Sequence, residues 1–237
     1  MLQLLPVAIL AGGVAMRMRP LTQTRPKALI EVGGEPFVCH QLAYLRDQGV
    51  TNVVLCVGYL GSMIEEVVGN GAAFGLTVRY VYDGDRLLGT GGALKRALPL
   101  LQERFFVLYG DSYLPCDFRA VQQAFSHSGK LALMTVLRNE GRWDASNVLF
   151  EDGRIVAYDK RNPTDEMAHI DYGLGILSAP IFDAYQDGEV FDLADLYHAL
   201  SRRGQLVGLE VQQRFYEIGS PQGLKDAEAY FSTKEKI

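Results

Sequence analysis

The chain begins with a short, continuously apolar segment that ends in two glycines. Residues 7–11 read Val-Ala-Ile-Leu-Ala and precede Gly12-Gly13, which is typical of a strand buried on both faces of a sheet. A stretch with apolar residues at helical spacing then runs from Pro36 to Gln48 and stops at Gly49, and a second apolar segment follows at 52–57. The order of strand, helix and strand predicts a βαβ unit, whose parallel crossover is almost always right-handed.

The alternation continues through the first half of the chain and then changes. We expect further helices at 62–68 and 92–98, and strands at 77–82 and 105–109. The second half is richer in strands, which are expected at 131–137, 147–150, 154–158, 172–177 and 206–211, with a hairpin turn at Asp152-Gly153. Helices are expected to begin near Asp192 and at Ser220-Pro221. The pattern predicts the α/β class, with a Rossmann-like, doubly wound, mixed sheet in a single domain that spans residues 1–237.

The amino-acid composition limits the classes of partner that the chain is expected to bind. The 237 residues include 23 basic and 28 acidic ones, for a formal net charge of −5, and no run of Lys or Arg indicates a nucleic-acid interface. No apolar run approaches the roughly 20 residues that span a bilayer, and the N-terminus lacks a basic leader. We therefore expect a cytoplasmic protein that binds neither nucleic acid nor membrane. The scattered Cys and His residues indicate no zinc site, and self-association into a homo-oligomer is left open.

The segment after the first strand has the residue types of a phosphate site. Gly12 and Gly13 let backbone N–H groups approach a ligand closely, and the cations Arg17 and Lys27 follow, which suit phosphate oxygens. The spacing matches neither the dinucleotide fingerprint nor the P-loop. Taken alone, the glycines would equally suit a tight turn beside solvated arginines.

The segment from Leu10 to Lys27 closely resembles the signature of the sugar-phosphate nucleotidyltransferases. The matched positions are Gly12, Gly13, Arg17, Pro20, Leu21, Thr22, Pro26 and Lys27. Ala15 and Met16 depart from the signature, because the family has Gly and Thr there. The resemblance implies that the loop backbone cradles the triphosphate and that two cations act on its phosphates. The implied nucleotide-binding residues are Leu10, Ala11, Gly12 and Gly13, and the implied catalytic cations are Arg17 and Lys27.

Two further motifs follow in the family's order. Leu88-Gly89-Thr90-Gly91-Gly92 resembles the segment that contacts the nucleobase, through Gly89 and Thr90, although a glycine-rich helix start also suits close packing. Gly110-Asp111 ends a buried strand, where open α/β sheets bind ligands and where a carboxylate suits Mg²⁺. In the family this aspartate holds the metal and the glycine lies beside the nucleotide; a turn or capping aspartate is the plain alternative. The second metal carboxylate falls on Glu217, which is one methylene longer than the family's Asp.

The sugar side matches the family less closely. Asp159-Lys160 resembles the segment whose lysine binds the sugar phosphate, which places Lys160 on that phosphate and Asp159 near a sugar hydroxyl. A surface lysine is the ordinary alternative. Asp171-Tyr172-Gly173 resembles the segment that lines the sugar pocket, with Asp171 where the family has Asn. Trp143, the only Trp, is expected on a nearby loop, where packing is favoured over stacking on a ligand.

These resemblances imply an enzyme that joins a sugar 1-phosphate to the nucleotidyl part of a nucleoside triphosphate, with Mg²⁺ as cofactor and pyrophosphate as second product. Attack at the α-phosphorus spreads charge over phosphate oxygens, so positioned cations supply most of the catalysis. The string Leu88-Gly89-Thr90-Gly91-Gly92 most resembles that of guanylyltransferases acting on mannose or heptose 1-phosphates, which favours GTP. Uridylyl- and thymidylyltransferases have similar turns, and the sugar stays open.

Two other functions compete with this interpretation. A metal-dependent glycosyltransferase would want an Asp-x-Asp pair, which Asp111-Ser112-Tyr113 does not provide. A catalytically silent nucleotide-sugar sensor or regulatory subunit is kept open by Ala15, Met16 and Glu217, because each departs from the family pattern.

Overall fold

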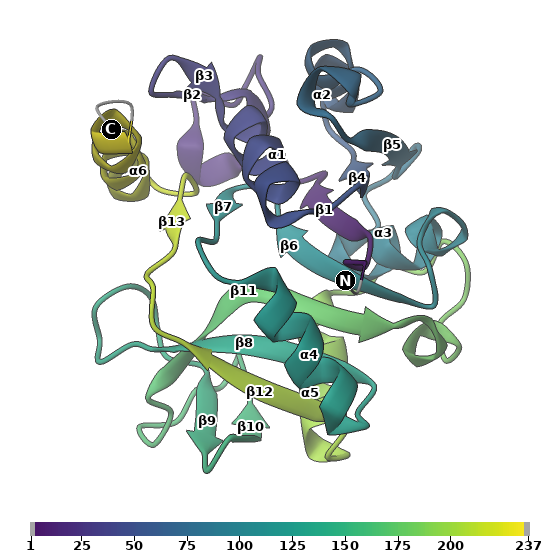
Figure 1. The fold of residues 1–237 in the computed structure, drawn as a ribbon, viewed down its shortest axis with the longest axis vertical. Coiled ribbons are helices and arrows are strands. Elements are labelled where there is room, and N and C mark those ends of the chain that lie inside the picture. The colour runs from purple at the N-terminus through teal and green to yellow at the C-terminus, as the bar shows by residue number, and fades with distance from the viewer. Residues whose placement is uncertain (1–2, 235–237) are drawn as a thin grey trace.

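The computed structural model describes residues 3–234, and its first half is a parallel sheet (Figure 1). The strand β1 (Val7–Ala11) lies between β4 (Asn52–Val57) and β6 (Arg104–Tyr109), and β5 (Thr77–Tyr82) pairs with the outer edge of β4. All of these neighbours are parallel. The carboxyl ends of β1, β4 and β6 therefore meet at one edge of the sheet, where Gly12 follows β1.

The second half of the chain extends this sheet with strands of mixed direction. The strand β11 (His169–Ser178) pairs antiparallel with β6 and with β8 (Ala132–Arg138), and β12 (Leu206–Val211) runs parallel to β8. The hairpin of β9 (Val148–Glu151) and β10 (Arg154–Tyr158) completes the nine-stranded order β5-β4-β1-β6-β11-β8-β12-β10-β9. The prediction of a mixed sheet is confirmed.

Helices cover both faces of the sheet, as the doubly wound fold requires. Alternate residues of β1 point to opposite faces, so Val7 and Ile9 join one core and Ala8 joins the other. The first core includes residues of α1 (Phe37–Gln48), α2 (Gly61–Val68) and α4 (Phe118–Ser128). The second includes residues of α3 (Gly89–Ala97) and α5 (Leu193–Arg202).

The helix α4 was absent from the sequence-based expectations. Its signal is an aspartate followed by apolar residues at helical spacing: Asp117 Oδ1 accepts hydrogen bonds from Arg119 N at 2.8 Å and Ala120 N at 3.2 Å, and Phe118, Val121 and Phe125 are buried. The start of α3 also differs, because it begins at Gly89 rather than near Gly92.

A third, smaller layer closes one end of the sheet (Figure 1). The short strands β13 (Tyr216–Glu217) and β7 (Ser112–Tyr113) pair with each other, and β13 leads into α6 (Pro221–Lys234). The helix α6 packs in a third apolar cluster with residues of β2, α1 and β7. A separate ribbon joins β2 (Glu31–Val32) to β3 (Glu35–Pro36). Short 3-10 turns are Met16–Met18, Lys27–Leu29, Ala72–Phe74, Leu98–Leu100 and Ala179–Phe182.

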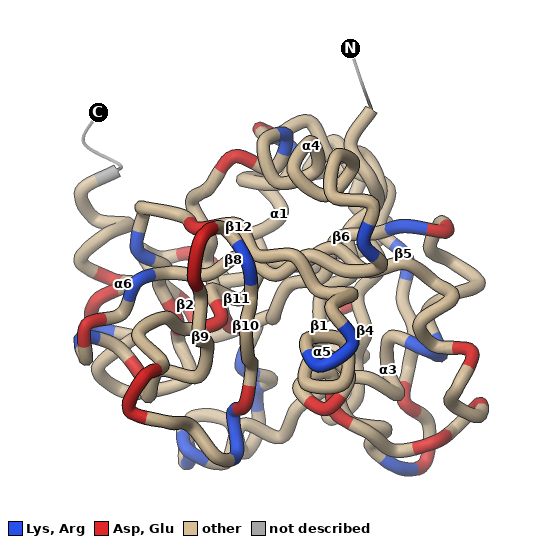
Figure 2. The backbone as a smooth tube through the Cα atoms, turned by 90° about the horizontal axis from the view of Figure 1, so that it is seen from below, with Lys and Arg blue, Asp and Glu red and all other residues tan. Residues whose placement is uncertain are grey.

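The charged residues are mixed over the molecule. Lys and Arg are interspersed with Asp and Glu along the loops in the view of Figure 2. Across residues 3–234, the structure contains no helix whose length and hydropathy would let it cross a membrane.

Candidate active site

Two adjoining pockets lie at the carboxyl edge of the parallel strands. The first, of about 270 Å³, opens where β4 and β6 leave β1 on opposite sides, which is the point where α/β sheets of this kind bind ligands. The second, of about 470 Å³, lies toward β11 and α6. Tyr109 and Asp111, at the end of β6, line both pockets. A ligand in each pocket would therefore meet its neighbour beside Asp111.

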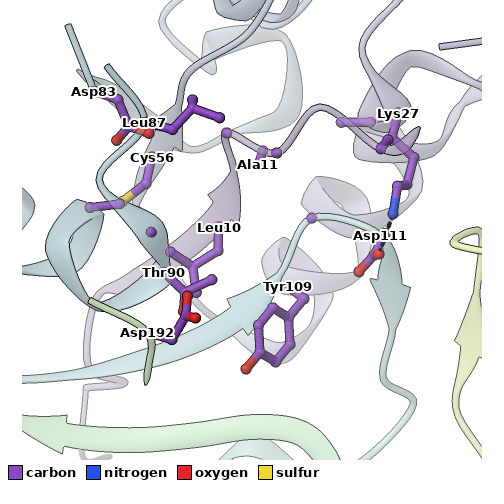
Figure 3. A pocket seen from close by; sticks show the side chains of 17 residues that line it. Leu10, Ala11, Lys27, Cys56, Asp83, Leu87, Thr90, Tyr109, Asp111 and Asp192 are labelled. Atoms are coloured by element: carbon purple, nitrogen blue, oxygen red, sulfur yellow. Dashed lines mark hydrogen bonds and ion pairs between the residues drawn. The ribbon is translucent and has the colours of Figure 1, made fainter. Parts of the chain in front are cut away.

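The first pocket is lined by nearly all of the residues that the sequence assigned to the nucleotide. They are Leu10, Ala11, Gly12, Gly13, Gly89, Thr90 and Gly110, together with Lys27 and Asp111. Figure 3 shows Lys27 and Asp111 at one end of this pocket and Asp83, Leu87 and Cys56 at the other. Lys27 Nζ lies 2.7 Å from Asp111 Oδ2, and both side chains are partly buried. The pocket thus has an ion pair at one end and a single carboxylate, Asp83, among apolar side chains at the other.

The conformation of the loop after β1 explains why the family has glycine at the position of Ala15. Ala15 has φ 48° and ψ 48°, in the left-handed region that residues with a Cβ rarely adopt. The buried hydroxyl of Thr22 donates to the Ala15 carbonyl oxygen at 2.8 Å and fixes this turn. Arg17 follows on the turn and is exposed; it lines the second pocket rather than the first.

Asp83 is a residue of the first pocket that the sequence did not indicate. Its side chain is buried, and Oδ2 accepts a hydrogen bond from Leu88 N at 3.3 Å. Burial raises the pKa of the Asp83 carboxyl, while the Leu88 N–H and the charge of Arg96 act in the opposite direction. In the sequence, Asp83-Gly84-Asp85 looks like an ordinary solvated turn, so only the fold reveals this carboxylate.

The glycine-rich start of α3 serves two purposes. The N–H groups of Gly91 and Gly92 both donate to the Phe191 carbonyl, at 2.9 and 3.2 Å. A Cβ on Gly91 would come within 2.3 Å of the Phe191 ring, so this part of the motif serves close packing. Gly89 and Thr90 line the pocket, although a Cβ on Gly89 would also lie 2.6 Å from the Phe191 carbonyl oxygen. The Thr90 hydroxyl accepts from Leu193 N at 2.8 Å.

Gly110 shows a similar need for close approach. A Cβ there would lie 2.9 Å from the Cβ of Ala11 and 3.0 Å from the carbonyl oxygen of Leu10. The Gly110 N–H donates to that same Leu10 oxygen at 2.9 Å. The glycine therefore lets β6 pass β1 closely enough to put Asp111 at the junction of the pockets.

Asp111 directly precedes β7, and Glu217 lies on its partner strand β13, so both carboxylates lie beside Gly219. The Ile218 N–H donates to the Asp111 carbonyl at 2.9 Å. A Cβ on Gly219 would lie 2.7 Å from Glu217 Oε2, 3.3 Å from Asp111 Oδ2 and 3.4 Å from Lys27 Nζ, so the glycine leaves a small space bordered by two carboxylates and the ammonium group of Lys27. No group of three or more Cys, His, Asp or Glu side chains suited to a metal occurs within residues 3–234. One or two carboxylates are nevertheless what Mg²⁺ takes from proteins when substrate phosphates and water complete its shell.

Glu217 also stabilises the start of α6. The Ser220 hydroxyl donates to Glu217 Oε1 at 2.5 Å, and the Gly219 N–H donates to Oε2. The extra methylene of Glu, compared with the family's Asp, lets the carboxylate reach back over its own loop. Ser220 in turn accepts from Gly223 N at 3.0 Å, as expected for an N-cap.

The second pocket is lined by most of the residues that the sequence assigned to the sugar phosphate. Lys160, Asp171, Tyr172 and Gly173 line it. Asp171 Oδ1 accepts from Gly173 N at 2.9 Å. Burial raises the pKa of Asp171 to about 6, against the Gly173 N–H and the charge of Lys160.

Asp159 is not among the residues that line this pocket. Its Oδ1 accepts from Arg161 N at 2.9 Å and Asn162 N at 2.8 Å, so the carboxylate stabilises the turn after β10. Oδ2 of the same side chain lies 3.8 Å from His198 Nδ1.

A wall of the second pocket was missed in the sequence. Arg214, between β12 and β13, and Gln222 and Asp226, on α6, line it together with Trp143. Trp143 is far in the chain from the other three, and none of the four belongs to a matched motif, so no sequence pattern grouped them.

Comparison with known proteins now decides the family. A profile described as nucleotidyl transferase matches residues 7–143, more than half of the chain and most of the first pocket. The chain belongs to this family. It is 31% identical to the N-acetylmuramate alpha-1-phosphate uridylyltransferase of Neisseria meningitidis, over 93% of this chain and 96% of that protein. The expected family and enzyme class, the sugar-1-phosphate nucleotidyltransferases, are confirmed.

Other relatives differ in nucleotide and sugar. The nucleotidyltransferase chain is 31% identical to the mannose-1-phosphate guanyltransferase beta-B of Xenopus laevis, over 90% of its own length but 61% of that protein. It is 27% identical to the D-glycero-alpha-D-manno-heptose 1-phosphate guanylyltransferase of Aneurinibacillus thermoaerophilus, over 93% and 95% of the two chains.

Solved structures show the same fold. HddC from Yersinia pseudotuberculosis, complexed with GMP-PN, has a TM-score of 0.78 at 24% identity and covers 96% of this chain and 99% of that one. A putative glucose-1-phosphate thymidylyltransferase from Bacillus anthracis has a TM-score of 0.83 at 20% identity, over 95% and 94%. The expected fold class is confirmed.

Proposed function

We propose that this nucleotidyltransferase transfers guanylyl groups from GTP to a sugar 1-phosphate and releases pyrophosphate. The observation that carries the proposal is the junction of the two pockets at Asp111, which is paired with Lys27. A triphosphate in the first pocket would place its phosphates at the end with this ion pair, shown in Figure 3. A sugar phosphate bound by Lys160 would approach from the second pocket.

The proposed step is an in-line displacement. An oxygen of the sugar phosphate forms a bond to the α-phosphorus, and the bond from that phosphorus to the bridging oxygen breaks, so the electron pair leaves with pyrophosphate. Lys27 stabilises charge on the phosphates, and Arg17 adds a second cation from the side of the second pocket. Leu10, Ala11, Gly12 and Gly13 hold the nucleotide through their backbone.

The carboxylates at the junction suit a divalent cation, and we propose Mg²⁺. Asp111 and Glu217 would hold it, and the bound ion would supply positive charge to the phosphates. The space beside Gly219 supports this assignment. Lys27 then faces the phosphates as the protein's own fixed cation.

The choice of GTP is supported by Asp83. An ionised carboxylate only accepts hydrogen bonds, and the guanine edge offers two adjacent donors, N1–H and N2–H₂. Uracil and thymine offer a single N3–H between two carbonyl oxygens, which a carboxylate would repel. A buried carboxylate at the end of the pocket away from Lys27 therefore favours guanine. Gly89, Thr90 and Gly110 would border the nucleoside.

We also propose a cytoplasmic enzyme that acts as one domain over residues 1–237 and has these two substrates as its partners. The net charge of −5 and the mixed surface charge in Figure 2 support small phosphorylated partners over nucleic acid. A homo-oligomer is compatible with this proposal.

Pyrophosphate release tests the proposal. We would assay four nucleoside triphosphates against mannose, glucose, heptose and N-acetylmuramate 1-phosphates, with and without Mg²⁺. We expect release that needs both substrates and the metal and is fastest with GTP. Release without any sugar phosphate would contradict the reaction, and binding of nucleotide sugar without turnover would favour a silent sensor.

A further inference from the structure

One wall of the second pocket, here named the Arg214 wall, holds the guanidinium of Arg214 in one orientation. This wall is formed by Trp143, Arg214, Gln222 and Asp226. The guanidinium carbon of Arg214 lies 4.0 Å from the ring centroid of Trp143 and 4.7 Å from that of Tyr216. Both contacts are within the range of cation–π attraction. Arg214 Nη2 also donates to Asp226 Oδ2 at 2.9 Å. The guanidinium is therefore held by two residues close to it in the chain, Tyr216 and Asp226, and by the distant Trp143.

Asp226 accepts hydrogen bonds from two side chains, although the ion pair with Arg214 is partly exposed. The hydrogen bond from Arg214, followed by one from Gln222, lowers the pKa of Asp226. Arg214 keeps 34% of its side-chain surface exposed and Asp226 keeps 32%, although both line the pocket. The wall thus presents a donor and an acceptor side by side.

Arg214 has donors to spare. A guanidinium carries five N–H donors. Nε donates to the Phe215 carbonyl at 3.3 Å and Nη2 donates to Asp226, and the remaining N–H groups have no hydrogen-bond partner within residues 3–234. A rigid guanidinium with free donors on a pocket wall is suited to read a ligand.

The charge of this part of the pocket indicates what kind of ligand fits. Arg214 is neutralised by Asp226, and Arg142 is paired with Glu140 at 2.6 Å. Asp144 adds a further carboxylate to the lining.

Lys160 and Arg17 also line this pocket, and the proposed function places both on phosphate groups. A second acidic group on the sugar would therefore find only the two paired arginines and would face carboxylates. Hydroxyl groups, which both donate and accept, match the Arg214 and Asp226 pair.

We propose that Arg214 is a specificity-determining residue, which binds hydroxyl groups of a neutral sugar in the second pocket and disfavours sugars that carry a carboxylate. The proposal rests on the proposed function. It adds to that function the class of sugar and the residue that selects it.

Trp143 makes the proposal measurable without turnover. It is the only Trp of the chain, it lines the second pocket and it contacts Arg214. We would titrate the enzyme with mannose, glucose and heptose 1-phosphates and with N-acetylmuramate 1-phosphate, which carries a carboxylate, and follow Trp143 fluorescence. We expect the tightest neutral sugar phosphate to bind at least about tenfold more tightly than the acidic one.

Variants separate the role of Arg214 from a structural one. In Arg214→Met we expect the Kd and KM for the neutral sugar phosphate to rise about tenfold or more, with the KM for GTP within about twofold of wild type. Arg214→Lys, which keeps the charge, should recover part of the affinity. Arg138→Met is the matched control, since Arg138 is an exposed arginine that pairs with Glu140 at 3.3 Å and does not line the pocket, and it should change the Kd by less than about twofold.

These experiments distinguish failure of the role proposed for Arg214 from failure of the proposed function. Unchanged sugar-phosphate affinity in a folded Arg214→Met, tighter binding of the acidic sugar, or no response to any neutral sugar phosphate would overturn the role of Arg214. If wild type binds these sugars as expected but releases no pyrophosphate, the proposed function fails and the Arg214 assignment stands. If Arg214→Met does not fold, the same titration is made with Arg214→Lys. The proposal is overturned if Arg214→Lys binds neutral sugar phosphates with wild-type affinity and the wild type shows no preference for neutral over acidic sugar phosphates.

Discussion

The ammonium group of Lys27 lies 2.7 Å from Oδ2 of Asp111, although 84 positions of the chain separate the two residues. Lys27 stands on the turn that ends the first motif, and Asp111 follows the strand β6, next to β1 in the sheet. The pairing of β1 with β6 is what brings the two motifs together. Since Asp111 borders both pockets, this contact marks where the reacting phosphates would meet.

Removing either partner of this pair should slow the reaction far more than it weakens the fold. We expect Lys27→Ala or Asp111→Asn to lose about 2 to 4 kcal/mol of transition-state stabilisation, a fall in kcat/KM of roughly 30- to 1,000-fold. Steady-state pyrophosphate assays would measure it. Arg25→Ala is the control, because Arg25 is an exposed cation paired with Glu31 near Lys27 and should stay within about twofold. Wild-type kcat/KM in either site variant would sink the assignment.

Asp83 should control the choice of base. In Asp83→Asn one acceptor becomes a donor, so we expect the ratio of kcat/KM for GTP over UTP to fall by about tenfold or more. Asp85→Asn, an exposed neighbour, should leave the ratio unchanged. Because burial raises the pKa of Asp83, the KM for GTP should rise as pH falls through that pKa and the carboxyl is protonated. An unchanged ratio would remove Asp83 from base recognition.

The left-handed Ala15 should be a site where glycine stabilises the protein. Ala15→Gly relieves the backbone strain, which stabilises the folded state, and raises the entropy of the unfolded chain, which destabilises it. We expect the first effect to be larger, with a net gain of about 0.5 to 1 kcal/mol in the free energy of unfolding. Ala120→Gly, in the first turn of α4, is the control and should lose up to about 1 kcal/mol. Urea denaturation would measure both, and a loss of stability in Ala15→Gly would argue against the strained loop.

The carboxyl of Asp171 should make stability depend on pH in a defined sense. Its pKa is raised to about 6 in the folded protein, so the folded state holds the proton more tightly than the unfolded state. Wild type should therefore lose stability as pH rises from about 4 to 6, with a penalty of at most about 3 kcal/mol that persists above pH 6. Asp171→Asn keeps an acceptor for Gly173 N and should be more stable than wild type at pH 7.

The comparison of denaturation curves at several pH values checks this sign. The stability difference between Asp171→Asn and wild type should be largest above pH 6 and vanish near pH 4. A difference that does not change between pH 4 and 8 would show that the carboxyl is not perturbed in the fold.

Much of the fold could be predicted because its strands are locally encoded. The ranges expected for β1, β4, β5, β10 and β12 match the structure, since each is a short apolar or alternating run bounded by turn residues. The helix α4 was missed although Asp117 offered a cap and Phe118, Val121 and Phe125 a helical spacing. In the turn of Asp152-Gly153 both residues have positive φ, as the hairpin signal predicted.

Site residues could be predicted from the sequence only where they belong to a contiguous motif. Leu10 to Gly13, Lys27, Gly89 and Asp111 lie within contiguous matched segments, and the structure gathers them in one pocket. Asp83 lies beside Gly12 and Gly58, which follow β1 and β4, and Arg214 contacts Trp143, so the position of each depends on how distant segments pack. No local spacing carries such information.

Transfer of the guanylyl group from GTP to the phosphate of a sugar 1-phosphate can be observed directly. We would follow GTP, Mg²⁺ and the best sugar 1-phosphate with wild-type enzyme by ³¹P NMR. We expect the sugar phosphomonoester signal to disappear while the signals of the sugar nucleotide diphosphodiester and of pyrophosphate appear in equal amounts, and we expect Lys27→Ala to slow all three changes together. Hydrolysis of GTP with the sugar phosphate left intact, or sugar transfer without pyrophosphate, would contradict the proposed transfer.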